Sequence, residues 1–229
     1  MRMRQIIRTP SLKRHVHDEP YAALVLSGGY EEAGDQGRFR VNAGNAIFHD
    51  AFEAHLDRFS KQGAIVLNLR LAPAGRYTTG LGRVADPDLV VRVAESDQDA
   101  AADLLLSTAA RWTPQLADWP DELAAILMEC PSLRLSEWGE EKGIAPWTIS
   151  RGFAQVFGVS PEAFRARVRA RKAWKAVQGT VVPLAAIAAE LGFADQAHMT
   201  RSVKELTGLA PQAWRSAANR FKTEGRCTV

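Results

Sequence analysis

An internal repeat in the last third of the 229-residue chain constrains its fold more than any other feature of the sequence. Residues 135–165 can be laid over residues 184–215, with one extra residue in the second copy. Glycine, arginine and proline recur at matching places in the two copies: Gly143 with Gly192, Arg151 with Arg201, Gly158 with Gly208, and Pro161 with Pro211. An aromatic residue closes each copy, Phe164 in the first and Trp214 in the second. The repeat predicts that one structural unit occurs twice.

Each copy has the pattern of two helices joined by a short turn. Gly143 and Gly192 are expected to end the first helix of each pair, because a left-handed backbone is easiest without a side-chain branch. Gly139 and Ala188 are small residues at the place where a second helix must cross closely. The second helix carries an apolar inner stripe, formed by Ile149, Phe153 and Val156 in the first copy and by Met199, Val203 and Leu206 in the second. This pattern predicts helix-turn-helix units, whose second helix lies in the DNA major groove.

A long basic helix, from Pro161 to about Gln178, is predicted between the two copies. Its apolar stripe is expected to comprise Ala166, Ala170, Ala173 and Val177. Basic residues occupy the rest of its circumference: Arg165, Arg167, Arg169, Arg171, Lys172 and Lys175. These side chains could form a solvated surface or contact phosphates. Phosphate neutralisation supplies most of the non-specific affinity for DNA.

The distribution of charge also separates the two ends of the chain. Residues 1–130 carry 14 Lys and Arg against 18 Asp and Glu, whereas residues 131–229 carry 15 against 8, and the net charge is +3. An acidic first part joined to a basic second part favours two domains, of which the second suits a polyanion.

Residues from about 120 to 216 resemble the paired helix-turn-helix domain of the AraC/XylS family of bacterial transcription regulators. The second copy fits the family signature closely, through Ala188-Ala189, Gly192 to Gln196, His198-Met199, Arg201, Gly208 and Pro211. The first copy departs from it by carrying Gly139, where Ala is usual, and Trp147 at the start of the recognition helix.

The resemblance implies that outward residues of the two recognition helices reach bases or phosphates. In the first helix these are Trp147, Thr148, Ser150, Arg151 and Gln155. In the second they are Asp195, Gln196, His198, Arg201 and Lys204, with Arg165, Arg169 and Lys172 of the joining helix as phosphate contacts. Asp195 is also well placed to be the N-cap of its helix, and Arg151 and Arg201 could have a partly structural role.

The first part of the chain is predicted to form an antiparallel sheet. Short apolar runs separated by turn residues, such as Ala22–Leu26 before Ser27–Gly29 and Ala64–Leu71 before Pro73, favour a sandwich or barrel. From about Asp86 the pattern becomes helical. We therefore expect an α+β chain of two domains: a barrel over 1–85, a helical linker or dimerisation segment over 86–119, and a double helix-turn-helix domain over 120–229. Leu104, Leu105 and Leu106 could face a partner or their own core.

Three histidines of the first domain follow a known pattern. His15 and His17 alternate, so both can point to the same side of a strand, and His55 follows Gly44 by eleven residues. This resembles a cupin barrel over residues 13–72, with Asp50 and Phe52 in the proline and glycine places of the second motif. This register lacks the glutamate ligand of that family, since Tyr21 or Ala22 stands in its place. Glu19 could supply an oxygen instead, and His49 falls outside the motif.

Three imidazoles at His15, His17 and His55 could hold Zn²⁺, Ni²⁺ or Fe²⁺ with open coordination positions. The alternative is a metal-free cavity for a small organic effector, which is what the resemblance to the regulators implies.

The function that best fits these features is a one-component transcription regulator. Its partners would be double-stranded DNA, a small-molecule effector, a second copy of the chain, and RNA polymerase if it activates transcription.

The sequence predicts no membrane span and no signal peptide. Its two cysteines, Cys130 and Cys227, have no paired spacing, which suits the bacterial cytoplasm and its nucleoid. A cupin metalloenzyme with an appended helical domain is the alternative; a DNA-alkylation repair protein would need a reactive-cysteine motif that neither cysteine provides.

Overall fold

A computed structural model describes residues 4–72, 79–112, 118–130 and 132–224 of the chain. The chain divides into two compact units. The first comprises Met1–Glu122 with Val156–Gly158, and the second comprises Leu123–Gln155 with Val159–Val229. None of the helices in the described ranges is long and apolar enough to cross a bilayer. The boundaries expected at residues 85 and 119 remain predictions.

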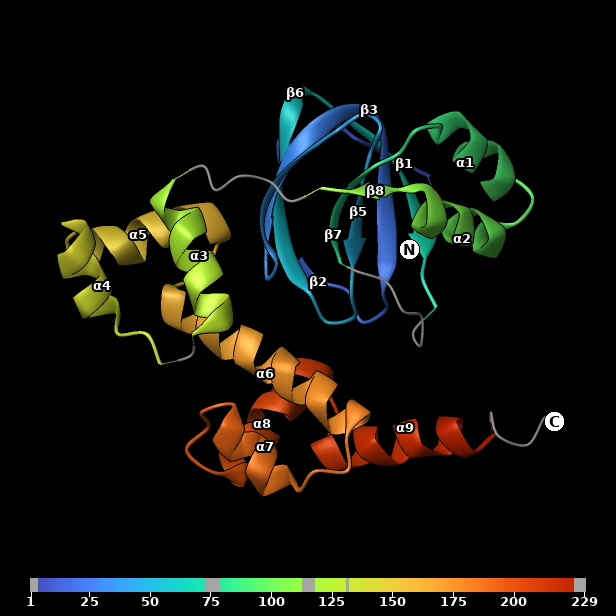
Figure 1. The fold of residues 1–229 in the computed structure, drawn as a ribbon. Helices are drawn as coiled ribbons and strands as arrows, with labels where there is room; N and C mark the ends of the chain where they lie inside the picture. Colours follow the sequence, from blue (N-terminus) through green and yellow to red (C-terminus); the bar gives the residue numbers. More distant parts are fainter. Residues whose placement is uncertain (1–3, 73–78, 113–117, 131, 225–229) are drawn as a thin grey trace. The chain divides into compact units, whose positions relative to one another are not determined.

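The first unit is built on one antiparallel sheet (Figure 1). Its strands are β1 (Arg4–Ile7), β2 (Ser11–Val16), β3 (Tyr21–Gly34), β4 (Gly37–Asn42), β5 (Asn45–His49), β6 (Ala54–Arg70), β7 (Gly80–Arg83) and β8 (Ala110–Arg111). They follow the order β1-β6-β3-β5-β7-β8, with β2 also paired to β6 and β4 to β3. The expected α+β fold class is confirmed, but the sheet is not closed into the barrel that was expected. The end strands β1 and β8 have four and two residues and do not pair with each other within the described ranges.

The long strand β3 contains a bulge where the sequence predicts a turn. The pairing of β3 with β6 shifts register between Val25 and Ser27 and again between Gly28 and Tyr30. Gly28 has φ +73°, and a Cβ there would lie 2.0 Å from the carbonyl oxygen of Gly63. Only glycine fits this close approach of two strands, so the Ser27–Gly29 segment bends the strand and does not end it.

Two helices, α1 (Pro87–Ala94) and α2 (Gln98–Thr108), complete the core of the first unit. Asp86 and Asp97 are their N-caps. The carboxylate of Asp86 accepts a hydrogen bond from the main-chain N–H of Leu89, and that of Asp97 accepts one from the N–H of Ala100. The helices contribute buried residues to one cluster with Leu24, Phe48 and Leu69 of the sheet: Val90, Ala94, Ala101, Ala102 and Leu105. Leu105 is fully buried in this core, and Leu104 and Leu106 pack against it. The three leucines thus serve the unit's own core.

The second unit is helical, as predicted. Its helices are α3 (Trp119–Glu129), which enters the unit at Leu123, α4 (Leu135–Lys142), α5 (Pro146–Phe157), which belongs to it up to Gln155, α6 (Pro161–Gly179), α7 (Leu184–Glu190), α8 (Gln196–Thr207) and α9 (Pro211–Glu224). The pairs α4–α5 and α7–α8 are the two repeat copies, and α6 is the long helix that joins them (Figure 1).

The buried face of α6 is wider than the predicted stripe. Ala170, Ala173 and Val177 are buried as expected, but Ala166 is exposed. Five further residues of α6 are also buried: Pro161, Phe164, Val168, Arg171 and Trp174. The predicted stripe is too narrow because α6 contacts α7, α8 and α9 and is covered over a broad arc.

Candidate functional site

The turns of both helix-turn-helix units have the backbone that the repeat predicts. Gly143 follows α4 with φ +65°, and Gly192 follows α7 with φ +70°, both in the left-handed region. In the first helix-turn-helix unit, α4 and α5 cross so closely that a Cβ on Gly139 would lie 2.7 Å from Cδ1 of Ile149. The small residue predicted at this crossing is therefore required by the packing.

The inner faces of the recognition helices α5 and α8 are buried. Ile149 and Phe153 of α5 are at most 2% exposed, and the Phe153 ring meets that of Phe164 edge-on at 5.3 Å between centroids. Met199 and Val203 of α8 are fully buried. These contacts orient each recognition helix and fix which of its residues face outward.

The residues predicted to touch DNA lie on the opposite faces. On α5, Trp147 is 66% exposed, Ser150, Arg151 and Gln155 are exposed, and Thr148 is half-buried. On α8, Gln196, Arg201 and Lys204 are exposed, whereas His198 is half-buried with its ring edge-on to Phe193. Trp147, Arg151 and Gln155 follow one another at four-residue steps, so they share one face of α5. Each helix thus presents hydrogen-bond donors or acceptors to its surroundings.

Asp195 has the structural role that the sequence offered as an alternative. It is the N-cap of α8, and its carboxylate accepts a hydrogen bond from the main-chain N–H of His198 at 2.6 Å. This satisfies one of the free N–H groups at the start of the helix.

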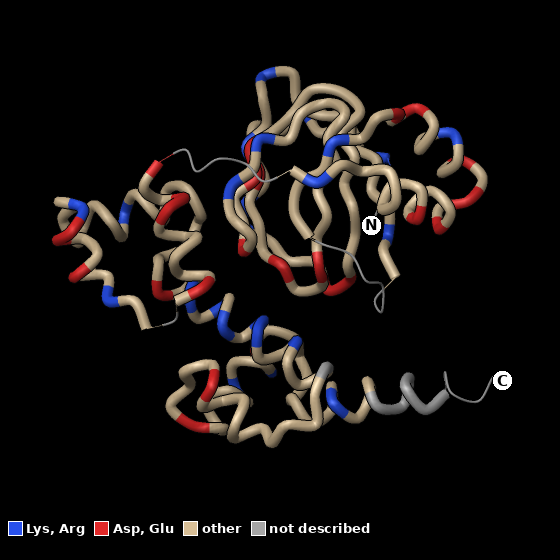
Figure 2. The backbone as a smooth tube through the Cα atoms, in the orientation of Figure 1, with Lys and Arg blue, Asp and Glu red and all other residues tan. Residues whose placement is uncertain are grey.

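The three α6 cations predicted to contact phosphate already have acceptors within the second unit. Arg165 donates to the carbonyl of Leu133 at 2.7 Å, Arg169 donates to that of Gly192 at 2.8 Å, and Lys172 donates to that of Met128. Basic residues lie along much of α6 (Figure 2). Phosphate contact by these three residues remains a prediction.

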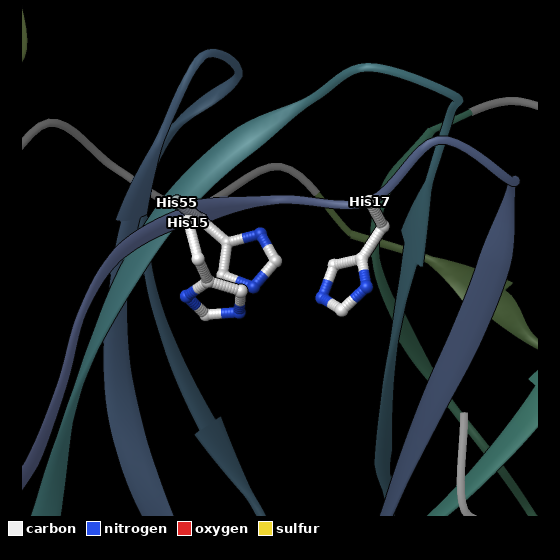
Figure 3. A group of neighbouring side chains, drawn as sticks. All are labelled: His15, His17 and His55. Carbon is white, nitrogen blue, oxygen red and sulfur yellow. The ribbon is translucent and has the colours of Figure 1, made fainter.

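In the first unit the strands bring the three predicted histidines together. His15 of β2 pairs with His55 of β6 in the sheet register, and His17 follows directly after β2. The ring centroid of His15 lies 5.0 Å from that of His17 and 4.3 Å from that of His55. One nitrogen of each ring lies within 4.8 Å of the other two. Figure 3 shows the rings pointing into one common space.

This histidine cluster lines a cavity of about 230 Å³. Tyr21, Glu32 and Asp57 add polar groups to its wall, and Leu12, Phe59 and Val66 add apolar ones. The hydroxyl of Tyr21, one of the two residues expected in the place of the cupin glutamate, lies 3.3 Å from Nε2 of His55. The Nδ1 atom of His55 is buried and has no hydrogen-bond partner within the described part of the chain. Such a nitrogen can coordinate a metal cation or accept a hydrogen bond from a donor group of a bound molecule.

Two residues of this region were missed by sequence reasoning. Glu32 of β3 and His49 of β5, both buried, form a second group of possible ligands with His55, again within 4.8 Å. His49 lies between two carboxylates, with Nε2 3.4 Å from Glu32 and Nδ1 3.4 Å from Glu53. Glu19, expected as an oxygen donor, is exposed and pairs with Arg70 at 3.3 Å. The buried carboxylates near the histidines are therefore those of Glu32, Glu53 and Asp57, and not that of Glu19.

Burial and neighbouring charges divide these histidines into two kinds. Burial, followed by the nearby His15 and His49, lowers the pKa of His17 to about 4. Burial and His49 also lower the pKa of His55 well below its usual value. For His49 burial lowers the pKa, but Glu32 and Glu53 outweigh burial and raise it to about 10. At neutral pH, His17 and His55 are therefore neutral imidazoles, and His49 is a cation between carboxylates.

Comparison with known proteins bears on the second unit. The family model described as a helix-turn-helix domain matches residues 138–217. No curated protein matches the sequence.

Solved structures similar to the chain include three bacterial proteins. The C-terminal domain of AraT, a response regulator from Geobacillus stearothermophilus, has 21% identity over 45% of this chain and 88% of its own, with a TM-score of 0.42. ToxT from Vibrio cholerae has 10% identity over 93% and 97%, with a TM-score of 0.43. A probable AraC family transcriptional regulator from Rhodopseudomonas palustris has 25% identity over 43% and 92%, with a TM-score of 0.38. Over residues 138–217, which hold the helix α6 and all of the two repeat copies except residues 135–137, the chain is a helix-turn-helix domain of the AraC type.

Proposed function

We propose that this protein is a sequence-specific DNA-binding transcription regulator, controlled by an effector that binds in the histidine-lined cavity of its first unit. One observation carries the proposal: the chain has two helix-turn-helix units whose recognition helices bury one face and leave polar side chains exposed on the other. The domain family does not favour the alternative of a cupin metalloenzyme with a helical appendage.

The recognition helices α5 and α8 would read successive major grooves on one face of the duplex, about one helical turn apart. Arg151 and Arg201 occupy matching repeat positions and can each donate two hydrogen bonds to a guanine edge. Ser150, Gln155 and Gln196 supply further donors and acceptors for base edges. Lys204 suits a phosphate oxygen, and the exposed Trp147 offers apolar contact with a thymine methyl group or sugar.

The effector would be a divalent metal ion or a small organic molecule. A metal fits the donor set, because two of the three imidazoles are neutral at physiological pH and the buried Nδ1 of His55 has no hydrogen-bond partner among the described residues. His15, His17 and His55 would hold Zn²⁺, Ni²⁺ or Fe²⁺, and such an ion would supply open positions for water or a ligand. Binding would shift the population between arrangements of the chain that are competent for DNA and arrangements that are not. We further expect the regulator to act in the bacterial cytoplasm, with a second copy and RNA polymerase as partners.

Selection from a random duplex library with the full chain tests the proposal. The enriched duplex should bind Arg151→Ala and Arg201→Ala variants about 10-fold or more weakly, since a bidentate arginine–guanine contact contributes about 1–3 kcal/mol. The exposed Arg92→Ala variant in α1 removes the same charge from the first unit and should bind as the wild type does. Equal affinity of all three variants, or failure of the wild type to enrich any sequence, would refute the proposed reading of DNA.

A further inference from the structure

Three cations of α6 share one face of that helix and donate hydrogen bonds to main-chain carbonyls of the segments before and after it. Arg165, Arg169 and Lys172 follow at four- and three-residue steps, which places them in one row. They line a cavity of about 190 Å³ together with Glu129 and Glu190. The two carboxylates lower the net positive charge of this row, so it is a less attractive surface for a polyanion than the count of cations implies.

Two of these cations hold the connection that leads into the first helix-turn-helix unit. Lys172 donates to the carbonyl of Met128, the last residue but one of α3, and Arg165 donates to that of Leu133 at 2.7 Å, two residues before α4. Carbonyls at the C-terminal end of a helix have no intrahelical donor. A cation there completes the hydrogen bonding and interacts favourably with the helix dipole.

The third cation holds the turn of the second helix-turn-helix unit. Arg169 donates to the carbonyl of Gly192 at 2.8 Å, and its guanidinium lies 4.9 Å from the centre of the Phe193 ring. Gly192 and Phe193 are in the turn between α7 and the recognition helix α8. A guanidinium that both donates to a carbonyl and stacks on a ring is fixed in direction, which a flexible lysine would not be.

We propose that Arg165, Arg169 and Lys172 are positioning residues that lock the two helix-turn-helix units at one separation and one rotation, and thereby set the half-site spacing that the protein accepts. This inference rests on the proposed function. One inserted base pair moves a half-site by about 3.4 Å and rotates it by roughly 35°. A rigid pair of units cannot follow such a change, whereas a loosened pair can.

Binding to the selected duplex and to versions with one base pair added or removed between the half-sites tests the role in spacing. The wild type should discriminate the selected spacing from the altered ones by at least about 10-fold. Arg169→Ala should bind the selected spacing more weakly and the altered spacings with nearly equal affinity. Arg169→Lys, which keeps the charge, should restore only part of the discrimination. If Arg169 instead contacts phosphate, Arg169→Ala should give the opposite pattern. All spacings would then lose affinity by the same factor, and the negative slope of log K against log salt would become less steep by about 0.9.

Lys204→Ala serves as the reference for that opposite pattern, because its exposed side chain on α8 is proposed to contact phosphate. If Arg169→Ala behaves as Lys204→Ala does, the positioning role is refuted.

A second measurement without DNA separates this inference from the proposed function. Spin labels at Glu141→Cys on α4 and Glu205→Cys on α8, with Cys130 and Cys227 changed to Ser, report the distance between the units. The distance distribution should be narrow and should broaden in Arg169→Ala; an unchanged distribution would overturn the proposal even if no duplex is enriched.

Discussion

Asp195 illustrates how one side chain at a recognition helix can be assigned to structure or to DNA. Its carboxylate accepts from the N–H of His198 and caps α8. In the sequence Asp195 directly precedes Gln196, a predicted DNA contact, so the sequence permits either a capping role or a DNA-binding role for Asp195. The geometry assigns the carboxylate to the helix, because an acceptor at this position satisfies a main-chain donor that would otherwise be free.

The capping role predicts different outcomes for two substitutions. Asp195→Ala should lower the free energy of unfolding by about 1 kcal/mol, whereas Asp195→Ser should keep most of it, since serine is also a good N-cap. Urea unfolding followed by circular dichroism measures both values, and binding to the selected duplex is measured in parallel. If both variants keep full stability and both lose DNA affinity, Asp195 is a DNA contact and not a cap.

The strands β3 and β5 are joined within the core by a charged bridge as well as by their ladder. His49 of β5 lies 3.4 Å from the carboxylates of both Glu32 and Glu53, and all three are nearly completely buried. Removing the imidazolium cation from this group would leave the negative charges of the two buried carboxylates unneutralised. His49→Gln should therefore destabilise the first unit by about 3 kcal/mol. His17→Gln, a half-buried and neutral site, should change stability much less, measured by urea unfolding with chelator present. Equal stability of the two variants would contradict the bridge.

These elements also show where sequence reasoning succeeds and where it fails. Helix caps, glycine turns and the apolar stripes of α5 and α8 are set by residues close in sequence, so the double helix-turn-helix fold and its outward residues could be predicted. The sheet is not closed into a barrel because its end strands β1 and β8 do not pair within the described ranges, which short apolar runs alone do not reveal. Glu32 was missed for a local reason. The bulge near Gly28 shifts the register of β3, so alternation counted from Tyr21 does not carry to Glu32. His49 was missed because its role depends on carboxylates from two other segments.

The proposed control of DNA binding by the first unit would be a property of the whole chain. If a metal ion is the effector, tag-free protein should contain it in near-stoichiometric amount by elemental analysis, and His55→Ala should lose it. His198→Ala, which removes a histidine from the second unit, should retain it. Metal-loaded and chelator-treated protein should differ in affinity for the selected duplex by about 5-fold or more, and His55→Ala should abolish the difference. Metal that binds without changing DNA affinity would exclude it as the effector, and absence of metal would direct the search to organic ligands.

Hydroxyl-radical footprinting of the full chain on the selected duplex examines most directly whether both helix-turn-helix units read DNA. We expect two protected segments about 10 base pairs apart on one face of the duplex. Arg151→Ala should weaken protection of one segment and Arg201→Ala that of the other, because these residues hold matching positions in α5 and α8. A single protected segment that depends on only one of the two arginines would contradict paired recognition and leave the other unit with a structural role.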